Sequence, residues 1–487
     1  MGKNVIISVF DKTNLDVIAK YLVEKKFTIY STGGTSKFLK TIKIPHIEIS
    51  KYTSQKEILG GRVKTLHPKI FGGLLGTNTN EHKNELKKQK IVEFDLLIVN
   101  LYPFKETVKN AKNKSKIIEM IDIGGHSLIR AAVKNYEKTI PLIEPNDYDH
   151  FIKNFPLKKL SKKKLAIKAI DHITKYDLEI SNWFKGKSLT MYPLRYGENP
   201  QQKASAIIDK KKFSQISGDK KLSYNNLLDV DAGVNLTYGF KTKNSICAII
   251  KHGTPCGASL KKDQSESYLN ALAGDPLSSF GGVIAFNQRL KKQTAELLIK
   301  NFYEVVTAPE FEKGALKLLR GKKNLRVIRV KKSIRKIEER SFFGGTLVQD
   351  VNSTISSVEE INGKNKLDKE KLGFFINVLK NIKSNAIALF NRDSLISQSG
   401  GQTSRVDALQ ICLNKLKYKD KTKKIETLFL FSDAFFPFTD SLSIIQKQKC
   451  QIDIYAPMGS KSDSKIINYV KKNKLKFFKL SERHFKH

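Results

Sequence analysis

The chain has 487 residues, which is too long for a single typical core. Its composition, 40% hydrophobic and 28% charged, is that of a globular protein. No apolar run reaches the roughly 18 residues of a membrane span, so no membrane association is expected. A net charge of +41, from 88 Lys and Arg against 47 Asp and Glu, permits nucleic-acid binding. Because lysine is scattered along the whole chain, we favour solvated surface charge and phosphate-bearing small substrates, and we expect no nucleic-acid partner.

Cysteine usage and the first residues bear on the cellular compartment. Cys247, Cys256, Cys412 and Cys450 are too widely spaced for a disulfide framework or a zinc cluster, so we expect no bound metal. The apolar run after Met1 is too short for a signal peptide and instead predicts a first strand. A reducing, cytoplasmic location fits these observations.

The first part of the chain alternates short apolar strands with amphipathic helices. Apolar residues at helical spacing predict a helix over residues 14–25, between the first two strands. This alternation favours a doubly wound α/β domain at residues 1–150, followed by a basic helical linker at residues 151–190. Strands are predicted at residues 5–10, 28–31, 96–100 and 139–143.

The second part, residues 191–487, is also predicted to be mixed α/β. A polar, loop-like stretch near residues 340–371 divides it into two subdomains. Strands are predicted at residues 204–208, 246–250, 282–286, 325–329, 386–389, 427–431 and 453–455.

Several polar motifs of the first domain lie at strand ends or glycine turns. The Thr-Gly-Gly-Thr motif at residues 32–35 separates a strand from a helix, where hydroxyls and amides bind phosphate. A glycine pair precedes residues 62–65, which project Arg62 and Lys64 to one side if the segment is extended. Tyr102 follows a strand directly, and Asp122 precedes another glycine pair. Each residue has a structural alternative when taken singly, but together they predict a polar pocket.

Residues 60–68, 100–104 and 121–125 resemble the IMP cyclohydrolase half of the bifunctional purine biosynthesis enzyme, which also carries AICAR transformylase. The resemblance implies a methylglyoxal-synthase-like fold and ring closure of FAICAR to IMP with loss of water. By matching position it implies catalysis by Lys64, Tyr102, Asp122 and Lys134, and substrate binding by Lys12, Thr32, Gly33, Gly34, Thr35, Arg62 and Thr65.

In the second part, an apolar strand runs straight into Lys251 and His252 and then into a turn rich in Gly and Pro. Open α/β sheets place chemistry at such strand ends. Histidine exchanges a proton near neutral pH, and an adjacent ammonium stabilises developing negative charge. A solvated basic pair is the alternative for these two residues alone.

Further motifs of the second part each fit a nucleotide or a pterin. Arg195 and Tyr196 combine a cation with a ring, which is typical of sites that hold a phosphate beside a flat heterocycle. The side-chain amide of Asn385 can hydrogen-bond an amine or a formyl oxygen, and a glycine turn before Arg405 fits an anion. The aromatic cluster at residues 431–438 is either core packing or a platform for a pterin ring.

These segments, with residues 275–282 and 483–487, resemble the AICAR transformylase half of the same enzyme, so the motifs cover nearly the whole chain in family order. The resemblance implies a duplicated cytidine-deaminase-like α/β fold without zinc, and formyl transfer from 10-formyltetrahydrofolate to the amine of AICAR. It also implies a homodimer with transformylase sites between subunits. His252 would act as base, Lys251 would stabilise the oxyanion, and Asn385 would orient the formyl group. The residues implied to hold the nucleotide are Arg195, Tyr196, Arg405 and Arg483, and those facing the folate are Phe280, Gly281, Phe435, Phe438 and Asp440.

Three departures from the family pattern are visible. Phe10 stands where a second hydroxyl residue is common, Met458 and Ser462 interrupt a Gly-Gly-Ser-x-Arg-Asp pattern, and residues 330–371 form a shorter segment than usual. Phe10 and Met458 support one alternative, in which one activity is kept and the other half is degenerate.

Overall fold

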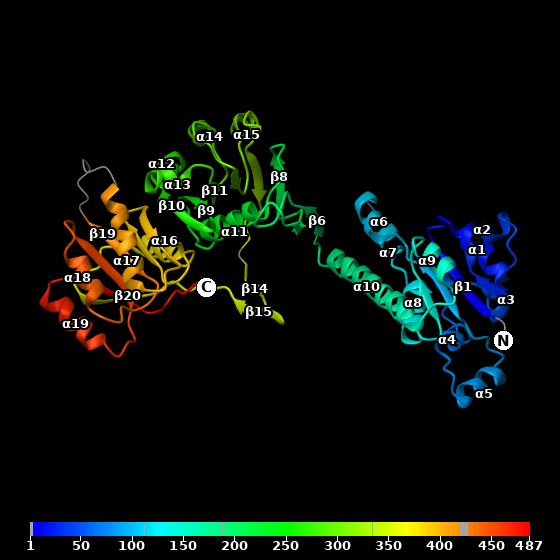
Figure 1. Ribbon diagram of the computed structural model, residues 1–487. Coiled ribbons are helices and arrows are strands. Elements are labelled where there is room, and N and C mark those ends of the chain that lie inside the picture. The colour runs from blue at the N-terminus through cyan, green and yellow to red at the C-terminus, as the bar shows by residue number, and fades with distance from the viewer. Residues whose placement is uncertain (1–2, 112, 188, 334, 419–426) are drawn as a thin grey trace. The chain divides into compact units, whose positions relative to one another are not determined.

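A computed structural model describes residues 3–111, 113–187, 189–333, 335–418 and 427–487 of the chain. The chain forms two compact units, of which the first ends at Lys187 and the second extends to His487. Figure 1 labels the elements of both units, with the first unit in blue and cyan. Each unit has its own sheets and its own buried apolar clusters, so each is described by itself.

The first unit is built on one five-stranded sheet. Its strands are β1 (Lys3–Val9), β2 (Phe27–Ser31), β3 (Ile47–Glu48), β4 (Leu96–Asn100) and β5 (Ile140–Leu142). Their order is β3-β2-β1-β4-β5, and every pair is parallel. Successive side chains of a strand point to opposite faces, so Val5 and Ile7 of β1 pack into one core cluster and Ile6 packs into another. The predicted doubly wound α/β class is therefore confirmed for this unit.

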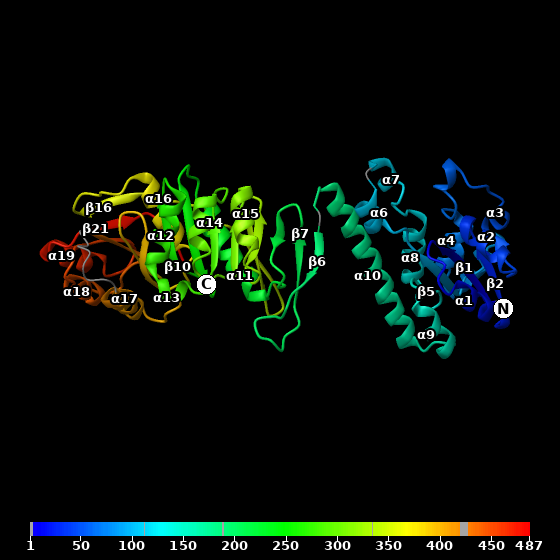
Figure 2. The same cartoon turned by 90° about the horizontal axis from the view of Figure 1, so that it is seen from above.

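Helices cover both faces of this sheet. They are α1 (Leu15–Glu24), α2 (Gly33–Thr41), α3 (Ile49–Thr53), η1 (Leu59–Gly61), α4 (Pro68–Leu75), α5 (Asn80–Lys88), α6 (Phe104–Asn110), α7 (Lys114–Ile118), α8 (Gly124–Lys134), α9 (Asp147–Asn154) and α10 (Lys159–Phe184). The apolar residues of α1, α2 and α9 share a core cluster with Val5, and those of α4, α8 and α10 share one with Ile6. Ala169 and Ile173 of α10 are fully buried in the second cluster, and α10 lies along α8 (Figure 2). The segment expected as a linker therefore contributes to the core of the first unit.

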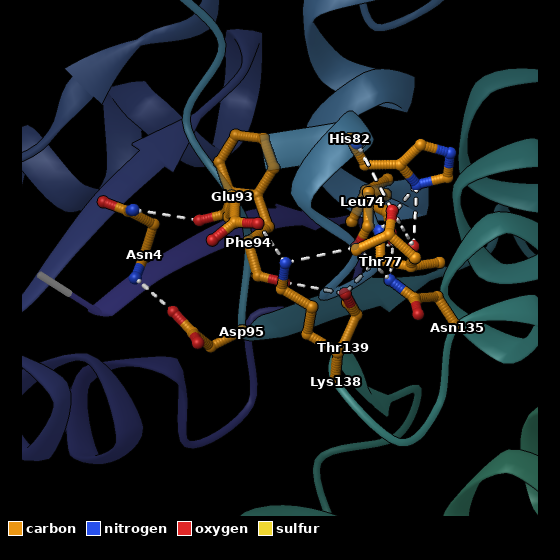
Figure 3. A network of polar contacts seen from close by, with 12 residues as sticks. Asn4, Leu74, Thr77, His82, Glu93, Phe94, Asp95, Asn135, Lys138 and Thr139 are labelled. Atoms are coloured by element: carbon orange, nitrogen blue, oxygen red, sulfur yellow. Dashed lines mark hydrogen bonds and ion pairs between the residues drawn. The ribbon is translucent and has the colours of Figure 1, made fainter. Parts of the chain in front are cut away.

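Hydrogen bonds close the edge at which these strands begin (Figure 3). The buried hydroxyl of Thr139, just before β5, donates to the backbone carbonyl of Phe94 at 2.7 Å. Asn4 donates its side-chain amide to the carbonyl of Glu93 and its backbone N–H to the carboxylate of Asp95, each at 2.9 Å. Because the fold satisfies these groups, the polar groups at the opposite edge, where the strands end, are the ones placed to bind a ligand.

The second unit contains two six-stranded sheets and two hairpins. Its strands are β6 (Leu189–Pro193), β7 (Ser205–Asp209), β8 (Phe213–Ser217), β9 (Ser245–Lys251), β10 (Thr254–Lys261), β11 (Val283–Phe286), β12 (Val305–Ala308), β13 (Arg326–Val330), β14 (Ile337–Phe342), β15 (Gly345–Asp350), β16 (Val358–Asn362), β17 (Ile387–Phe390), β18 (Leu395–Ser399), β19 (Leu428–Ser432), β20 (Ile452–Pro457) and β21 (Phe477–Leu480). The sheet orders are β10-β9-β11-β12-β13-β8 and β16-β21-β20-β19-β17-β18. Both sheets mix parallel and antiparallel pairs, which agrees with the predicted pair of α/β subdomains.

The helices of the second unit complete its cores. They are α11 (Tyr224–Tyr238), α12 (Gln264–Gly274), α13 (Pro276–Ser279), α14 (Lys292–Leu298), α15 (Lys313–Arg320), α16 (Lys369–Leu379), α17 (Arg405–Asn414), η2 (Lys415–Tyr418), α18 (Asp440–Gln446) and α19 (Asp463–Lys472). One buried cluster contains Ile250 of β9, Leu236 of α11, Phe375 of α16 and Phe431 of β19, so the two sheets share a core with α11 and α16.

The stretch near residues 340–371 differs from its prediction as a polar loop. It contains most of the β14–β15 hairpin, the whole of β16 and the start of α16. Its polar composition misled the prediction because the hairpin packs few of its side chains: Phe343 at the turn is fully exposed, and every residue of β15 is exposed. Residues 340–357 lie between β13, the last strand of the first six-stranded sheet along the chain, and β16, the first strand of the second.

Candidate functional site

A cavity of about 710 Å³ lies at the edge of the first unit where β1, β2 and β4 end. The carboxyl ends of neighbouring parallel strands meet at one edge, which is why motifs far apart in the sequence converge there. Most of the predicted residues line this cavity, namely Lys12, Thr32, Gly34, Thr35, Arg62, Lys64, Thr65, Tyr102 and Asp122. Gly33 lines a smaller adjoining cavity of about 170 Å³, which shares Thr32 and Lys64 with the first.

The start of α2 forms one corner of this cavity. Thr32 precedes the helix, and its hydroxyl lies 3.1 Å from that of Ser8 at the end of β1. No atom would come within 4 Å of a Cβ added to Gly34, so the backbone is open on that side. Helix N-termini bind anions through free N–H groups. Thr35 was predicted to bind substrate. Its buried hydroxyl instead donates to the carbonyl of Val9 at 3.0 Å and accepts the N–H of Val9 at 2.9 Å.

Lys64 reaches the same corner from a sharp bend in the chain. Leu59, Gly60 and Gly61 have φ values of 53°, 64° and 91°, which turn the chain back on itself. The Lys64 side chain crosses Gly61, where a Cβ would lie 2.6 Å from its Cε, and a Cβ on Gly33 would lie 3.2 Å from its Nζ. The ammonium is therefore beside the N-terminus of α2.

Two carboxylates that the motifs did not predict hold the cations of this bend. Glu57 lies 3.5 Å from the Lys64 ammonium, and Glu119 accepts a hydrogen bond from Nε of Arg62 at 3.2 Å. Arg62 and Lys64 thus line one cavity but have different partners. Neither glutamate belongs to a recognisable motif, because only the folded chain brings them beside the cations.

Asp122 is held at the start of α8. It accepts the backbone N–H of Gly125 at 2.7 Å, and a Cβ on Gly125 would lie 2.8 Å from its carboxylate and displace it. Burial raises the pKa of Asp122 above its ordinary value, against backbone N–H bonds from Gly125, Tyr102 and His126 that lower it. Tyr102 and Phe10 both line the cavity, with their rings edge to face at 5.7 Å between centroids.

Lys134 is the one predicted catalytic residue of this domain that the fold does not bring to the cavity. Asp122 lies just before α8, and Lys134 is the last residue of this 11-residue helix, about 15 Å farther along its axis. Lys134 is exposed there. Helical spacing from the motif placed both residues on the same element but did not reveal that they lie at its opposite ends.

In the second unit, Lys251 and His252 lie at a tight β-hairpin. Lys251 pairs with Thr254 across antiparallel strands β9 and β10, and His252 and Gly253 form the turn with φ values of 53° and 71°. The predicted Gly/Pro loop is therefore a hairpin. Asp229 of α11 accepts the N–H of Gly253 at 2.5 Å, and burial raises the pKa of Asp229, against hydrogen bonds and charges of the turn that lower it.

Lys251 connects this hairpin to the predicted folate-facing residues. Its ammonium donates to the backbone carbonyl of Phe280 at 2.7 Å. Gly281 follows with φ at 68°, and its N–H donates to the carbonyl of Phe302 at 2.9 Å. The rings of Phe280 and Phe302 lie 5.2 Å apart, and Phe280 is largely exposed. Phe302 was missed, because it lies in no motif and reaches the site only through the strand order.

The Lys251–His252 turn and Phe302 lie at the same edge of the sheet because β9 is antiparallel to β11. Ile250 pairs with Val283 antiparallel, whereas β11, β12 and β13 are parallel to one another. The carboxyl end of β9 therefore meets the amino ends of those three strands. The Lys251–His252 turn therefore lies at the edge opposite to the one that the rule for open parallel sheets predicts.

Arg195 and Tyr196 lie in a polar group near the start of β13. The guanidinium of Arg195 is 5.2 Å from the ring centroid of Tyr196. Burial lowers the pKa of Arg326, which feels the charges of Glu304 and Arg195. Glu304 lies 3.5 Å from Arg326 and accepts the side-chain amide of Asn226 at 2.7 Å. Asn226 and Arg326 were not predicted as site residues.

The buried Arg405 and the half-buried Asn385 form a cluster beside β17 and β19. Nη2 of Arg405 donates to Oδ1 of Asn385 at 2.7 Å, and Nη1 donates to Oδ1 of Asp433 at 2.6 Å. The Asn385 amide nitrogen donates to the carbonyl of Gln402 at 3.0 Å. Arg405 thus bonds to internal partners and supports Asn385. This role differs from the prediction that Arg405 itself binds the substrate.

The remaining predicted residues lie around this cluster. Phe435 and Phe438 are exposed on either side of the buried Phe436. Asp440 begins α18 and accepts the N–H of Ser441 at 2.6 Å. Arg483 packs its guanidinium 5.1 Å from the ring centroid of Phe485. The exposed rings support the platform interpretation of this aromatic segment, and the buried one supports core packing.

Within the residues that the structure describes, no group of at least three His, Cys, Asp or Glu side chains is placed to hold a metal ion. In the same part of the chain, no helix has the length and apolar character needed to cross a membrane.

Comparison with known proteins places the chain in a family. The AICARFT/IMPCHase bienzyme model matches residues 132–415, and the MGS-like domain model matches residues 14–127. The chain is 39% identical to the bifunctional purine biosynthesis protein PurH of Prochlorococcus marinus (strain MIT 9515), over 100% of both chains. The PurH proteins of Persephonella marina and Fusobacterium nucleatum subsp. nucleatum are 37% and 38% identical, again over 100% of each chain. The chain therefore belongs to the AICARFT/IMPCHase bienzyme family, and it is a bifunctional purine-biosynthesis enzyme with AICAR formyltransferase and IMP cyclohydrolase activities.

Proposed function

We propose that the two activities occupy separate sites: ring closure of FAICAR in the domain of residues 1–150, and formyl transfer in residues 191–487. The observation that carries this proposal is the assembly of the two motif sets in different compact units. The family implies 10-formyltetrahydrofolate as the cosubstrate. We further propose that the enzyme is cytoplasmic, binds only small molecules besides a second copy of itself, and needs no metal.

In ring closure, the carboxamide nitrogen of FAICAR attacks the formyl carbon. The formyl oxygen leaves as water with one proton from the carboxamide nitrogen and one from the formamide nitrogen, which forms the new C=N bond. The ribose phosphate would bind at the start of α2, where Lys64 adds a positive charge. That ammonium then polarises the formyl oxygen, and Tyr102 passes it a proton. Asp122 accepts the carboxamide proton, which its raised pKa favours because a base works best when its pKa lies nearer the working pH. Lys134 has no part in this proposal.

In formyl transfer, the amine of AICAR attacks the formyl carbon, the bond from that carbon to the folate nitrogen breaks, and the folate nitrogen takes up a proton. The amine loses a proton as it attacks, and a base must assist because delocalisation of its lone pair into the ring makes it a poor nucleophile. His252 would take that proton, held in place by the hairpin turn. Lys251 uses one N–H on the carbonyl of Phe280, which leaves two for the tetrahedral oxyanion. The exposed ring of Phe280 offers a face for the pterin.

The remaining predicted residues would bind the nucleotide, the formyl group and the folate. Arg195 and Tyr196 would hold AICAR through charge and stacking. Asn385 would orient the formyl group while Arg405 fixes its amide. Phe435, Phe438, Asp440 and Arg483 belong to the second sheet region, and we propose that two subunits combine these groups with the Lys251–His252 turn.

One pair of variants tests the separation of the sites. His252→Ala should abolish formyl transfer and leave cyclisation of supplied FAICAR intact, whereas Lys64→Ala should do the reverse. Each protein is its own folding control, because the unaffected activity reports a folded chain. Loss of both activities in a folded single variant would refute the assignment of two sites.

A further inference from the structure

The last residues of the chain lie against the Asn385 cluster of the second unit. The backbone N–H of His484 donates to the carbonyl of Asp433 at 2.8 Å, and the carbonyl of Lys486 accepts the N–H of Ser384 at 2.8 Å. Asp433 belongs to the cluster, and Ser384 directly precedes Asn385. The end of the chain is therefore hydrogen-bonded to two of the residues that surround the Asn385 amide.

His484 anchors residues 481–487, which we call the C-terminal segment. Its imidazole is fully buried, and Nε2 lies 2.8 Å from the hydroxyl of Ser356, which is buried too. Nδ1 lies 3.4 Å from the side-chain amide nitrogen of Asn352. Because that nitrogen only donates, Nδ1 accepts, and the proton stands on Nε2, where the Ser356 oxygen accepts it. Burial, with the nearby ammonium of Lys380, lowers the pKa of His484 to about 4, so the ring is neutral at pH 7.

The loop that receives this imidazole is itself held in place. The ammonium of Lys380, at the end of α16, donates to the carbonyls of Asn352 and Thr354 at 3.1 and 2.6 Å. The hydroxyl of Ser356 also accepts the backbone N–H of Glu482 at 3.3 Å. Because buried polar groups are costly to leave unpaired, this set of partners favours one position of the ring.

The burial of His484 decides which side chains of the C-terminal segment point outward. Arg483 and Phe485, on either side of it, are exposed, and the guanidinium of Arg483 lies 5.1 Å from the ring centroid of Phe485. A shift of the segment by one residue would place one of these two side chains in the imidazole site, and a guanidinium buried there without a carboxylate is strongly unfavourable. The imidazole therefore fixes the register in which Arg483 faces outward beside the Asn385 cluster.

We propose that His484 is a positioning residue for formyl transfer: held by Ser356, it fixes the C-terminal segment so that Arg483 reaches the nucleotide. The inference rests on the proposed function in assigning Arg483 to AICAR. His484 itself is buried and touches no substrate. A purely structural role would lower the stability of the second unit and leave the KM for AICAR unchanged, so the two roles give different results.

The first test removes the imidazole. Loss of its two hydrogen bonds predicts that His484→Ala raises the KM for AICAR by about 5- to 50-fold, because apparent affinity falls with the fraction of molecules that are arranged for binding. FAICAR cyclisation should stay unchanged, since it belongs to the first unit. His484→Gln keeps a donor and an acceptor and should recover most of the wild-type KM. In an Arg483→Ala background, His484→Ala should raise the KM by less than about two-fold more, because the residue through which it acts is gone.

A matched pair of serine variants leaves the imidazole in place. Ser356→Ala and Ser267→Ala each remove a buried hydroxyl of the second unit. The hydroxyl of Ser267, in α12, donates to the carbonyls of Ser245 and Ser259 at 3.1 and 3.0 Å. Both variants should lower the urea midpoint, but only Ser356→Ala should raise the KM for AICAR, by about two- to ten-fold.

Three results would overturn the inference: a wild-type KM for AICAR in folded His484→Ala, an equal rise in Ser267→Ala, or full additivity of His484→Ala with Arg483→Ala. If His484→Ala did not fold, a wild-type KM in Ser356→Ala would refute it instead. Arg483→Ala alone tests the proposed function, because a wild-type KM there would remove the nucleotide contact and this inference with it. Calorimetry of AICAR binding gives the same comparisons without turnover.

Discussion

Asp229 should control formyl transfer without touching substrate. His252 is held with φ at 53°, a conformation that costs a non-glycine residue about 1–3 kcal/mol. The carboxylate of Asp229 accepts the N–H of Gly253 at 2.5 Å, and a hydrogen bond to a charged group contributes about 1.5–3 kcal/mol. The two terms are comparable, so the bond is sufficient to offset the strain of the turn.

Asp229→Ala should therefore release the turn and lower kcat for formyl transfer by about 10- to 150-fold, since each 1.4 kcal/mol is about a factor of ten. Asp229→Asn keeps an acceptor oxygen but loses the charge, so its kcat should fall by about ten-fold or less. The KM for AICAR should change little in either variant, and cyclisation of supplied FAICAR by the same protein serves as the folding control. If Asp229→Ala kept kcat within about two-fold of the wild type, the carboxylate would not be what holds His252.

Two further predictions concern the glycine of β10 and the buried carboxylate of the first unit. A Cβ on Gly257 would lie 2.0 Å from the backbone carbonyl oxygen of Ala271, so Gly257→Ala should destabilise the second unit by about 1–3 kcal/mol or more, seen as a lower urea midpoint. An unchanged midpoint would mean that the strand and α12 are not so closely packed. The raised pKa of Asp122 means that its stabilising contribution is complete at acid pH and lost as pH rises through the folded-state pKa. Asp122→Asn should therefore leave stability at pH 7 unchanged or slightly higher while lowering the cyclisation rate by about 10²- to 10⁴-fold, and a clear loss of stability at that pH would contradict this account.

Strand patterns and motifs were sufficient to predict most of the first site. Short apolar runs of β-branched residues predicted β1, β2 and β4 within a few residues of their observed bounds. Parallel strands bring their carboxyl ends to one edge, so the motifs after those strands had to converge. Glu57 and Glu119 could not be predicted, because their pairing with Lys64 and Arg62 depends on the bend at residues 59–61. Likewise, only the folded helix showed that Asp122 and Lys134 lie at opposite ends of α8.

Sequence and tertiary structure contributed differently to the second site. The sequence alone predicted Lys251 and His252 as reacting groups, because they stand at the end of an apolar run within segments that resemble the AICAR transformylase half of the family. Only the tertiary structure decided that β9 is antiparallel to its neighbours, which sends this pair to the amino edge of β11, β12 and β13. The physical reason is that hydrophobic periodicity reports burial of a strand but not its direction in a sheet. The direction of β9 placed Phe280 and Phe302 beside Lys251.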